Sequence, residues 1–376
     1  MAIDGTIAGI VGYLNTTFIL GAGTSRHTGA PLISDFLAMA MKVMDDLEGK
    51  DDALYRVFDK IFVYIAENDA LESLLGCNFK NIEDVFGLLD LEARVIPSSQ
   101  PKRDALLQVI LHTLARTIKS EEKRRFSIAC EGPRDVAEFD STALEVFASL
   151  VANRPTNNPS NLRCGNAIIS LNYDTLVEAA MMATGVLEPD YGSQELSMNF
   201  GVDPRSRIQI LKLHGSTNWR TCPDCRITKA LGLSASVTET PACQCGKPMS
   251  PMLIPPSWDK GIHAPALKRV WQEAYLQLKN SRQWVFIGTS LPATDQYLRY
   301  LFAIALRRNV RLRHVIIVDP GDGANIKKLF EKSASRVHLE HLPQELVSAL
   351  GGEGTPSSLF RQLQCFAPAK DRPYEW

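Results

Sequence analysis

The chain has 376 residues, of which 45% are hydrophobic, and its formal net charge is -1. This length predicts two or three structural units with a sizeable core, and the near-neutral charge gives no electrostatic reason to expect nucleic acid or an anionic membrane as a partner. The start of the chain has no secretory signal pattern, and no apolar run reaches the roughly 18 residues of a membrane helix, so we expect a soluble, cytoplasmic protein.

A short strand is predicted from Thr16 to Leu20, because its residues are β-branched or apolar. It runs directly into the glycine loop, Gly21-Ala22-Gly23-Thr24-Ser25. A strand that ends in small residues is a typical beginning of a nucleotide-binding sheet. Glycines let backbone amides approach phosphate oxygens, and a helix start favours negative charge. A plain tight turn would have the same glycines, so both interpretations stay open for this loop alone.

A helical region is predicted from about Asp35 to Asn153. Apolar residues recur there at helical spacing, in groups such as Leu54, Val57, Phe58, Ile61 and Phe62, or Leu106, Leu107, Ile110, Leu111 and Leu114. Breaks such as Glu131-Gly132-Pro133 separate the helices. We interpret this region as a helical insertion and not as a continuation of the sheet.

Strands return after a polar linker at residues 154–161. Four short apolar and β-branched segments are predicted as strands, at 167–171, 208–213, 284–287 and 315–318. Their nearly continuous apolar character is typical of strands that are covered on both faces of a parallel sheet. Amphipathic helices are predicted around 267–278 and 298–305.

Each of these four strands ends in polar residues. The tips are Asn172-Tyr173-Asp174-Thr175, His214-Gly215-Ser216, Gly288-Thr289-Ser290 and Asp319-Pro320. Ligands of an open parallel sheet bind at the carboxyl ends of its strands. We therefore expect the four tips and the glycine loop to converge on one crevice.

Asn172 and His214 are the candidate catalytic residues, because together they fit the opening of a nicotinamide riboside bond. Such a cleavage passes through an oxocarbenium-like ribose. It needs a polar group that positions the ribose hydroxyls or a water, and a base that works near neutral pH. Taken singly, Asn172 also fits a cap of the helix that starts near Asp174, and His214 also fits a satisfied histidine at the end of a strand.

Four of the eight cysteines lie in one short window, as Cys222-x-x-Cys225 and Cys243-x-Cys245. In an intracellular chain such crowding indicates metal rather than disulfides. Four thiolates make a closed tetrahedral site for structural Zn²⁺, with no open position for catalysis. The alternative is a set of reduced thiols that has lost the metal.

The order and spacing of these motifs resemble those of sirtuins. The resemblance is carried by Gly21-Ala22-Gly23-x-Ser25, Asn172-x-Asp174, Leu213-His214-Gly215 and Gly288-Thr289-Ser290, with the cysteines between the last two. It covers the sheet-forming parts, whereas the helical insertion has no counterpart in the compact deacylases. Its implied fold class is α/β: a Rossmann-like parallel sheet with a helical insertion and a small zinc ribbon.

The resemblance also implies how NAD⁺ would be bound. Gly21, Ala22, Gly23 and Ser25 would hold the pyrophosphate and the adjoining ribose. Asn172 and Asp174 would hold the ribose region on the nicotinamide side, and His214 would be the base linked to that ribose. Gly288, Thr289 and Ser290 would close on the phosphate and the adenosine ribose, and Asp319 would lie near the adenosine half.

Two departures separate the chain from the deacylase pattern. Sirtuin deacylases follow the glycine loop with Gly-Ile-Pro-Asp-Phe-Arg, but here three residues separate Gly29-Ala30-Pro31 from Asp35-Phe36, and Leu37 replaces the arginine. Deacylases also carry a Phe-Gly-Glu segment that pairs with the acyl-lysine peptide, where this chain has Met252-Leu253-Ile254-Pro255-Pro256-Ser257-Trp258. This pattern resembles the bacterial defence branch, in which NAD⁺ is hydrolysed during phage infection.

The resemblance therefore implies an NAD⁺ hydrolase that releases ADP-ribose and nicotinamide, with an NAD⁺-dependent protein deacylase and a non-catalytic NAD⁺ or ADP-ribose sensor as alternatives. By analogy with the defence branch, control by assembly or by a partner is expected, such as a DNA-translocase-type ATPase. The apolar stripe around Val57, Phe58, Ile61, Phe62 and Tyr64-Ile65 exceeds what covers a sheet edge, so we expect a homo-oligomer. A self-contained helical bundle is the alternative.

The expected partition of the chain follows from these boundaries. The Rossmann-like domain comprises residues 1–34, 154–219 and 251–350, the helical insertion 35–153, the zinc ribbon 220–250, and a tail 351–376.

Overall fold

The computed structural model describes residues 15–68, 78–118, 143–152, 166–183, 188–196, 207–233, 237–254, 264–292, 295–331 and 336–350. The predicted linker at 154–161, the break at 131–133 and the tail after 350 lie outside the described residues. Within them, no helix is both long and apolar enough to cross a membrane.

A seven-stranded sheet with all strands parallel forms the centre of the molecule, in the order β10-β9-β8-β1-β2-β4-β3. Five of its strands confirm the predicted ones: β1 (Thr16–Leu20), β2 (Ala167–Ser170), β4 (Arg207–Lys212), β8 (Gln283–Ile287) and β9 (His314–Val318). The edge strands β3 (Glu188–Asp190) and β10 (His338–Leu342) were not predicted. The strand β1 pairs with β2 on one side and with β8 on the other. The sheet is therefore extended in opposite directions from β1, and ligand crevices form at such a switch point.

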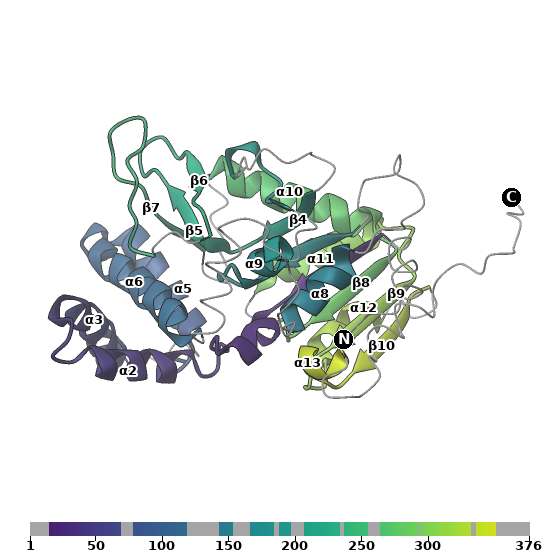
Figure 1. Cartoon of the computed structure of the whole chain (residues 1–376), viewed down its shortest axis with the longest axis horizontal. Helices are drawn as coiled ribbons and strands as arrows, with labels where there is room; N and C mark the ends of the chain where they lie inside the picture. Colours follow the sequence, from purple (N-terminus) through teal and green to yellow (C-terminus); the bar gives the residue numbers. More distant parts are fainter. Residues whose placement is uncertain are drawn as a thin grey trace, which may run out of the picture.

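The sheet is covered on both faces, which explains its apolar strands (Figure 1). Alternate residues of one strand enter different cores, as Phe18 and Ile19 of β1 do. One face packs against α10 (Pro265–Asn280), α11 (Gln296–Arg308) and α12 (Ala324–Phe330). The other packs against α8 (Ala143–Ala152), α9 (Leu176–Ala183) and α13 (Leu346–Ala349). The helix α8 lies within the sequence range expected for the insertion, yet its side chains pack on the sheet.

The insert helices have a core of their own. They are α2 (Phe36–Leu47), α3 (Asp52–Asn68), α5 (Ile82–Val95) and α6 (Gln100–Thr117). Phe58, Ile61 and Tyr64 are buried in this core, and Val57, Phe62 and Ile65 pack partly against it. The apolar stripe of α3 therefore packs inside the insert. The expectation that it forms excess apolar surface is wrong.

A three-stranded antiparallel ribbon links the sheet to the insert. Its strands are β6 (Thr228–Ala230), β5 (Gly215–Thr221) and β7 (Ser250–Leu253), with β5 in the middle. It begins directly after His214 at the tip of β4, and Leu253 at its other end belongs to the core of the insert. The predicted α/β class, with its parallel sheet, helical insertion and cysteine-bearing ribbon, is confirmed.

Candidate functional site

A cavity of about 790 Å³ lies at the carboxyl ends of the central strands. Every residue predicted for the dinucleotide site lines it: Gly21, Ala22, Gly23, Ser25, Asn172, Asp174, His214, Gly288, Thr289, Ser290 and Asp319. We call these strand tips the sheet wall. Because the tips come from four strands and the glycine loop, the parallel sheet brings together residues that are far apart in the sequence.

The glycines of the loop are required by close packing against the tip of β8. A Cβ on Gly23 would lie 2.7 Å from the Cα of Gly288, and Gly288 itself has a positive φ of 59°. The amides of Gly21 and Gly23 donate to the carbonyls of Ile287 and Gly288, at 3.0 and 2.9 Å. These two amides are therefore engaged within the chain. The close packing explains the glycines, and pyrophosphate binding by this loop stays a prediction.

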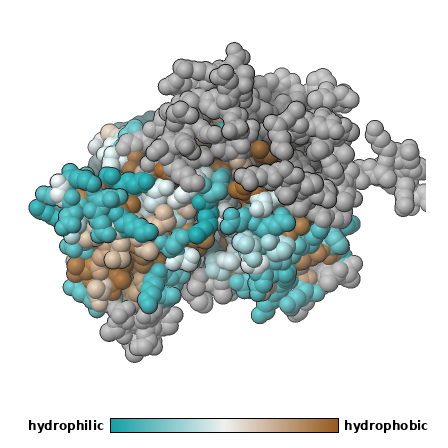
Figure 2. All heavy atoms as spheres, turned by 60° about the horizontal axis from the view of Figure 1, so that its bottom comes forward, coloured by the Kyte–Doolittle hydropathy of each residue, from teal (hydrophilic) through white to brown (hydrophobic). Residues whose placement is uncertain are grey.

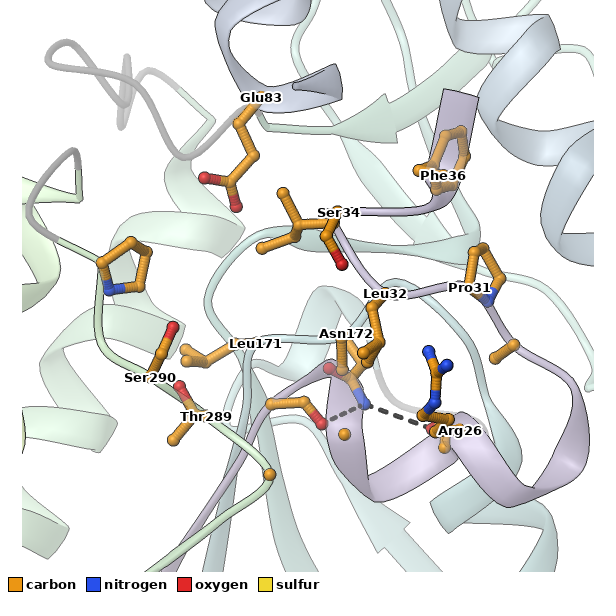
Figure 3. Close-up of a pocket in the computed structure, with 18 of the residues that line it drawn as sticks. Arg26, Pro31, Leu32, Ser34, Phe36, Glu83, Leu171, Asn172, Thr289 and Ser290 are labelled. Atoms are coloured by element: carbon orange, nitrogen blue, oxygen red, sulfur yellow. Dashed lines mark hydrogen bonds between the residues drawn. The ribbon is translucent and has the colours of Figure 1, made fainter. Parts of the chain in front are cut away.

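Asn172 is held in one orientation by the glycine loop. Its side-chain nitrogen donates to the carbonyl of Gly21 at 3.0 Å and to Ser25 Oγ at 3.2 Å, and only 8% of the residue is exposed (Figure 3). The amide oxygen, on the other branch of the side chain, points away from these two acceptors. A helix cap was the alternative interpretation of Asn172. In the structure this cap is Asp174, whose Oδ1 accepts the Leu176 amide at 3.1 Å.

His214 is also fixed on both sides of its ring. Its Nδ1 lies 3.1 Å from the carbonyl of Leu171, and its Nε2 lies 3.2 Å from Oδ2 of Asp295. A carbonyl only accepts, so Nδ1 carries a proton. A carboxylate beside Nε2 stabilises the doubly protonated, cationic ring, which is the form that a histidine base reaches after it takes a proton. Asp295 was not predicted. Its Oδ1 accepts the Leu298 amide at the start of α11, so the sequence signal available was that of an ordinary helix cap.

A buried ion pair supports these two tips from below. Lys212 Nζ lies 3.0 Å from Glu178 Oε1, and both side chains are at most 1% exposed. Lys212 also donates to the backbone carbonyl of Asp174. Burial raises the pKa of Glu178, although the ammonium of Lys212 acts in the opposite direction. Lys212 thus joins β4, which leads to His214, to α9 through Glu178 and to the tip of β2 through Asp174.

Two other tips form local hydrogen bonds at the ends of their strands, and their place near the adenosine half stays a prediction. The hydroxyl of Thr289 accepts the amide of Leu291 at 3.4 Å, and Oδ1 of Asp319 accepts the amide of Gly321 at 2.8 Å. Both residues form short turns at the ends of β8 and β9.

The insert forms a second part of the cavity, which we call the insert wall. It consists of Asn78, Lys80, Asn81, Ile82, Glu83 and Phe86 at α5 with Ile110 and Leu114 of α6. Figure 3 shows Glu83 extending into the cavity from the insert. None of these residues was predicted to line the site, because helical periodicity identifies apolar faces and not the neighbour that a side chain meets.

The four predicted metal ligands lie together at the end of the ribbon. The sulfur atoms of Cys222, Cys225, Cys243 and Cys245 all lie within 4.8 Å of one another. Four thiolates at the Zn–S distance of about 2.3 Å place their sulfurs about 3.8 Å apart, and two of the pairs here are 3.3 and 3.5 Å apart.

The local backbone also suits metal binding. Two similar turns present the cysteines, closed by hydrogen bonds from Arg226 to Cys222 and from Gly246 to Cys243, with positive φ at Arg226 and Gly246. The hydrogen bond from the Cys225 amide is the main cause that lowers the pKa of Cys222 to about 6, whereas, against the hydrogen bond from the Ile227 amide, the thiols of Cys222 and Cys243 raise the pKa of Cys225 to about 12. The cysteines are thus positioned to bind a metal ion such as structural Zn²⁺. They do not line the cavity.

Comparison with known proteins agrees with this arrangement. Residues 166–338 match a family model described as the SIR2-like domain. This range contains the tips of β2, β4, β8 and β9. The glycine loop precedes it in sequence, and the sheet joins that loop to it by placing β1 between β2 and β8.

The fold is similar to solved structures at low sequence identity. A Sir2 homolog in complex with NAD is 14% identical with a TM-score of 0.44, over 97% of this chain and 95% of that one. A mutant Sir2 homologue in complex with 2'-O-acetyl ADP ribose is 14% identical with a TM-score of 0.45, over 98% and 99%. No curated protein sequence matches the chain. On the family match, residues 166–338 of the chain carry a SIR2-like domain.

Proposed function

We propose that this protein hydrolyses NAD⁺ to ADP-ribose and nicotinamide. The observation that carries the proposal is the meeting of Asn172 and His214 with the glycine loop in one cavity. The SIR2-like domain supports NAD⁺ as the dinucleotide. Both candidate residues are nearly buried and each is fixed by two hydrogen bonds, and such fixed orientation is what catalytic positioning requires.

The reaction balances with water as the only co-reactant. The bond between C1' of the ribose and the nicotinamide nitrogen breaks, and its electron pair neutralises the pyridinium ring. The oxygen of water then bonds to C1' of the resulting cation. The oriented side-chain oxygen of Asn172 suits the positioning of a ribose hydroxyl or of this water. The pair of His214 and Asp295 suits the acceptance of the released proton, because Nε2 and Oδ2 lie 3.2 Å apart and can share it.

The backbone after β7 supports hydrolysis of the free dinucleotide over reaction with a peptide. The Ile254 amide donates to the carbonyl of His214 at 2.8 Å, and its carbonyl accepts from Tyr173 Oη at 2.8 Å. Both backbone groups of Ile254 are therefore used within the chain, at the place where deacylases carry the segment that pairs with substrate. A strand-forming peptide needs such groups to be open for pairing.

A turnover assay with purified protein and NAD⁺ tests the proposal. We expect nicotinamide and ADP-ribose in equal amounts without any acylated peptide. Release that requires an acyl-lysine peptide would identify a deacylase. Binding of NAD⁺ without any release would identify a sensor. Either of these two outcomes would overturn the hydrolase.

The biological setting that we propose rests on the resemblance to the defence branch: depletion of NAD⁺ during phage infection. We further propose that the protein is a homo-oligomer whose activity is controlled by assembly, with a DNA-translocase-type ATPase as a candidate partner. Figure 2 shows apolar surface on the side of the molecule where the insert lies. Large apolar residues exposed on the insert are Met41, Val63, Leu91, Val95 and Ile96, and exposed apolar clusters mark interfaces in many proteins.

A further inference from the structure

The insert contributes an acidic side chain to the cavity, and we propose that Glu83 binds the cationic nicotinamide end of NAD⁺. The inference rests on the proposed function for the choice of dinucleotide. It extends that function by making the insert part of the binding site, with a carboxylate that selects the oxidised, positively charged form of the cofactor.

Glu83 differs from the other acidic residues of the cavity in the element that carries it. Among the described acidic residues that line the cavity, Asp174 and Asp295 accept helix amides at the starts of α9 and α11, Asp319 follows β9, and Glu345 precedes α13. Glu83 is the one that comes from the insert. Figure 3 shows its carboxylate reaching into the cavity, with Asn172 and Ser290 on the sheet side and Arg26 across the cavity beside the glycine loop.

The side chain of Tyr173 connects Glu83 with the His214 side of the cavity. Burial raises the pKa of Tyr173 well above its ordinary value, and the next cause is the negative charge of Glu83. The centroid of the Tyr173 ring lies 6.3 Å from that of the His214 ring, and the Tyr173 hydroxyl donates to the carbonyl of Ile254. The charge of Glu83 therefore acts on this end of the cavity.

The chemistry of NAD⁺ matches a carboxylate there. The nicotinamide ring carries a positive charge in the ground state, and the charge moves to the ribose as the C1'–N bond opens. A carboxylate near both positions attracts the ring and stabilises the ribosyl cation. The pyrophosphate is anionic, so a carboxylate at the opposite end of the cavity does not repel it closely.

The position of Glu83 in the first turn of α5 offers a different explanation, since acids there stabilise a helix through its dipole. The neighbouring Asp84 provides the matched control. It occupies the same turn and carries the same charge, but it does not line the cavity and instead accepts the Asn78 amide at 2.8 Å. Helix stabilisation predicts similar effects at both positions. Recognition of the substrate predicts an effect at Glu83 alone.

The experiment compares NAD⁺ with NADH, because the two differ in the charge of the nicotinamide ring and share the rest of the molecule. Dissociation constants are measured by calorimetry in the full-length His214→Ala protein, which prevents turnover, with and without Glu83→Gln, Glu83→Asp or Asp84→Asn. We expect Glu83→Gln to reduce the preference for NAD⁺ over NADH about tenfold. Glu83→Asp should keep most of the preference, and Asp84→Asn should leave it within about twofold.

A general loss of folding or binding would change both dissociation constants together and leave their ratio unchanged, which would overturn the inference. An equal loss in Asp84→Asn, or a protein that binds neither dinucleotide, would overturn it as well. The result is separate from the test of hydrolysis. If the wild-type protein bound NAD⁺ but released no nicotinamide, the proposed activity would fail while the ratio would still decide the role of Glu83.

Discussion

The sheet wall and the insert wall of the cavity are built in different ways. On the sheet wall, each candidate catalytic group is fixed by hydrogen bonds to residues far away in the sequence, as Asn172 is by donating to Gly21 and Ser25. On the insert wall, the side chains extend from helices that are stabilised by their own core. Catalysis requires accurately positioned groups, and the sheet wall provides them. Selection of the ligand and its access to the cavity suit the insert wall, whose residues can differ without disturbing the sheet.

The largest effect is expected on the sheet wall, where His214→Ala and Asn172→Ala should each lower nicotinamide release by about 10²- to 10⁴-fold. The fold should stay intact, because each side chain ends in the cavity. Initial rates of nicotinamide release, with circular dichroism as the check on folding, measure this. A variant that keeps near-native turnover would remove that residue from the mechanism, and the functional contrast between the two walls would weaken.

A large effect on stability is expected below the sheet wall. Lys212→Met removes one partner of a buried ion pair and should lower the free energy of unfolding by about 3–5 kcal/mol. The double variant with Glu178→Gln should recover part of this loss, since no uncompensated charge remains. Urea denaturation of the wild type and both variants provides the values. Equal stability of the single and double variants would contradict the role of the buried charge.

The loss in Lys212→Met should also depend on pH. Burial already raises the folded-state pKa of Glu178 above its ordinary value of 4.5, and removal of the ammonium raises it further. A glutamate with a raised folded pKa stabilises the protonated folded state at low pH, and this stability is lost as pH rises through the folded pKa. The variant should therefore be closer to the wild type at pH 5 than at pH 8.

A smaller effect is expected from the ribbon, which lies between the two walls but outside the cavity. Metal analysis should find one Zn²⁺ per chain, and its removal by a chelator should lower the melting temperature by at least about 4 °C. Turnover at low temperature should persist until the ribbon unfolds. Added Zn²⁺ should restore the melting temperature, and a protein without zinc, or one whose stability ignores its loss, would contradict the structural metal.

The smallest effect on the chemistry itself is expected at the outer surface of the insert. Val95→Glu should dissociate the proposed homo-oligomer and change NAD⁺ turnover at the same time. Val310→Glu is the matched control, because Val310 is 72% exposed and Val95 is 71% exposed, but Val310 lies beyond α11 on the sheet domain. Light scattering and turnover are measured together. A wild-type protein that is monomeric at micromolar concentration with full activity would contradict control by assembly.

Much of the sheet wall could be predicted from the sequence because each strand and its polar tip are adjacent in the chain. A run such as 284–287 predicts a buried strand, and the residues after it must lie at the carboxyl edge. The edge strands were missed, since β3 has three residues and β10, with its His338, Glu340 and His341, lacks the apolar run of a central strand. The domain boundaries and the roles of the site residues remain predictions.

The sequence by itself determined the parallel sheet, the cysteine ribbon and the candidate residues at the strand tips, because local periodicity and spacing encode them. Only the tertiary structure decided that Asp295 faces His214, that Lys212 pairs with Glu178, and that Glu83 reaches the cavity. Each of these contacts joins elements whose separation in the chain carries no periodic signal. The side chain that a polar group meets is set by packing between elements, and packing is a property of the whole fold.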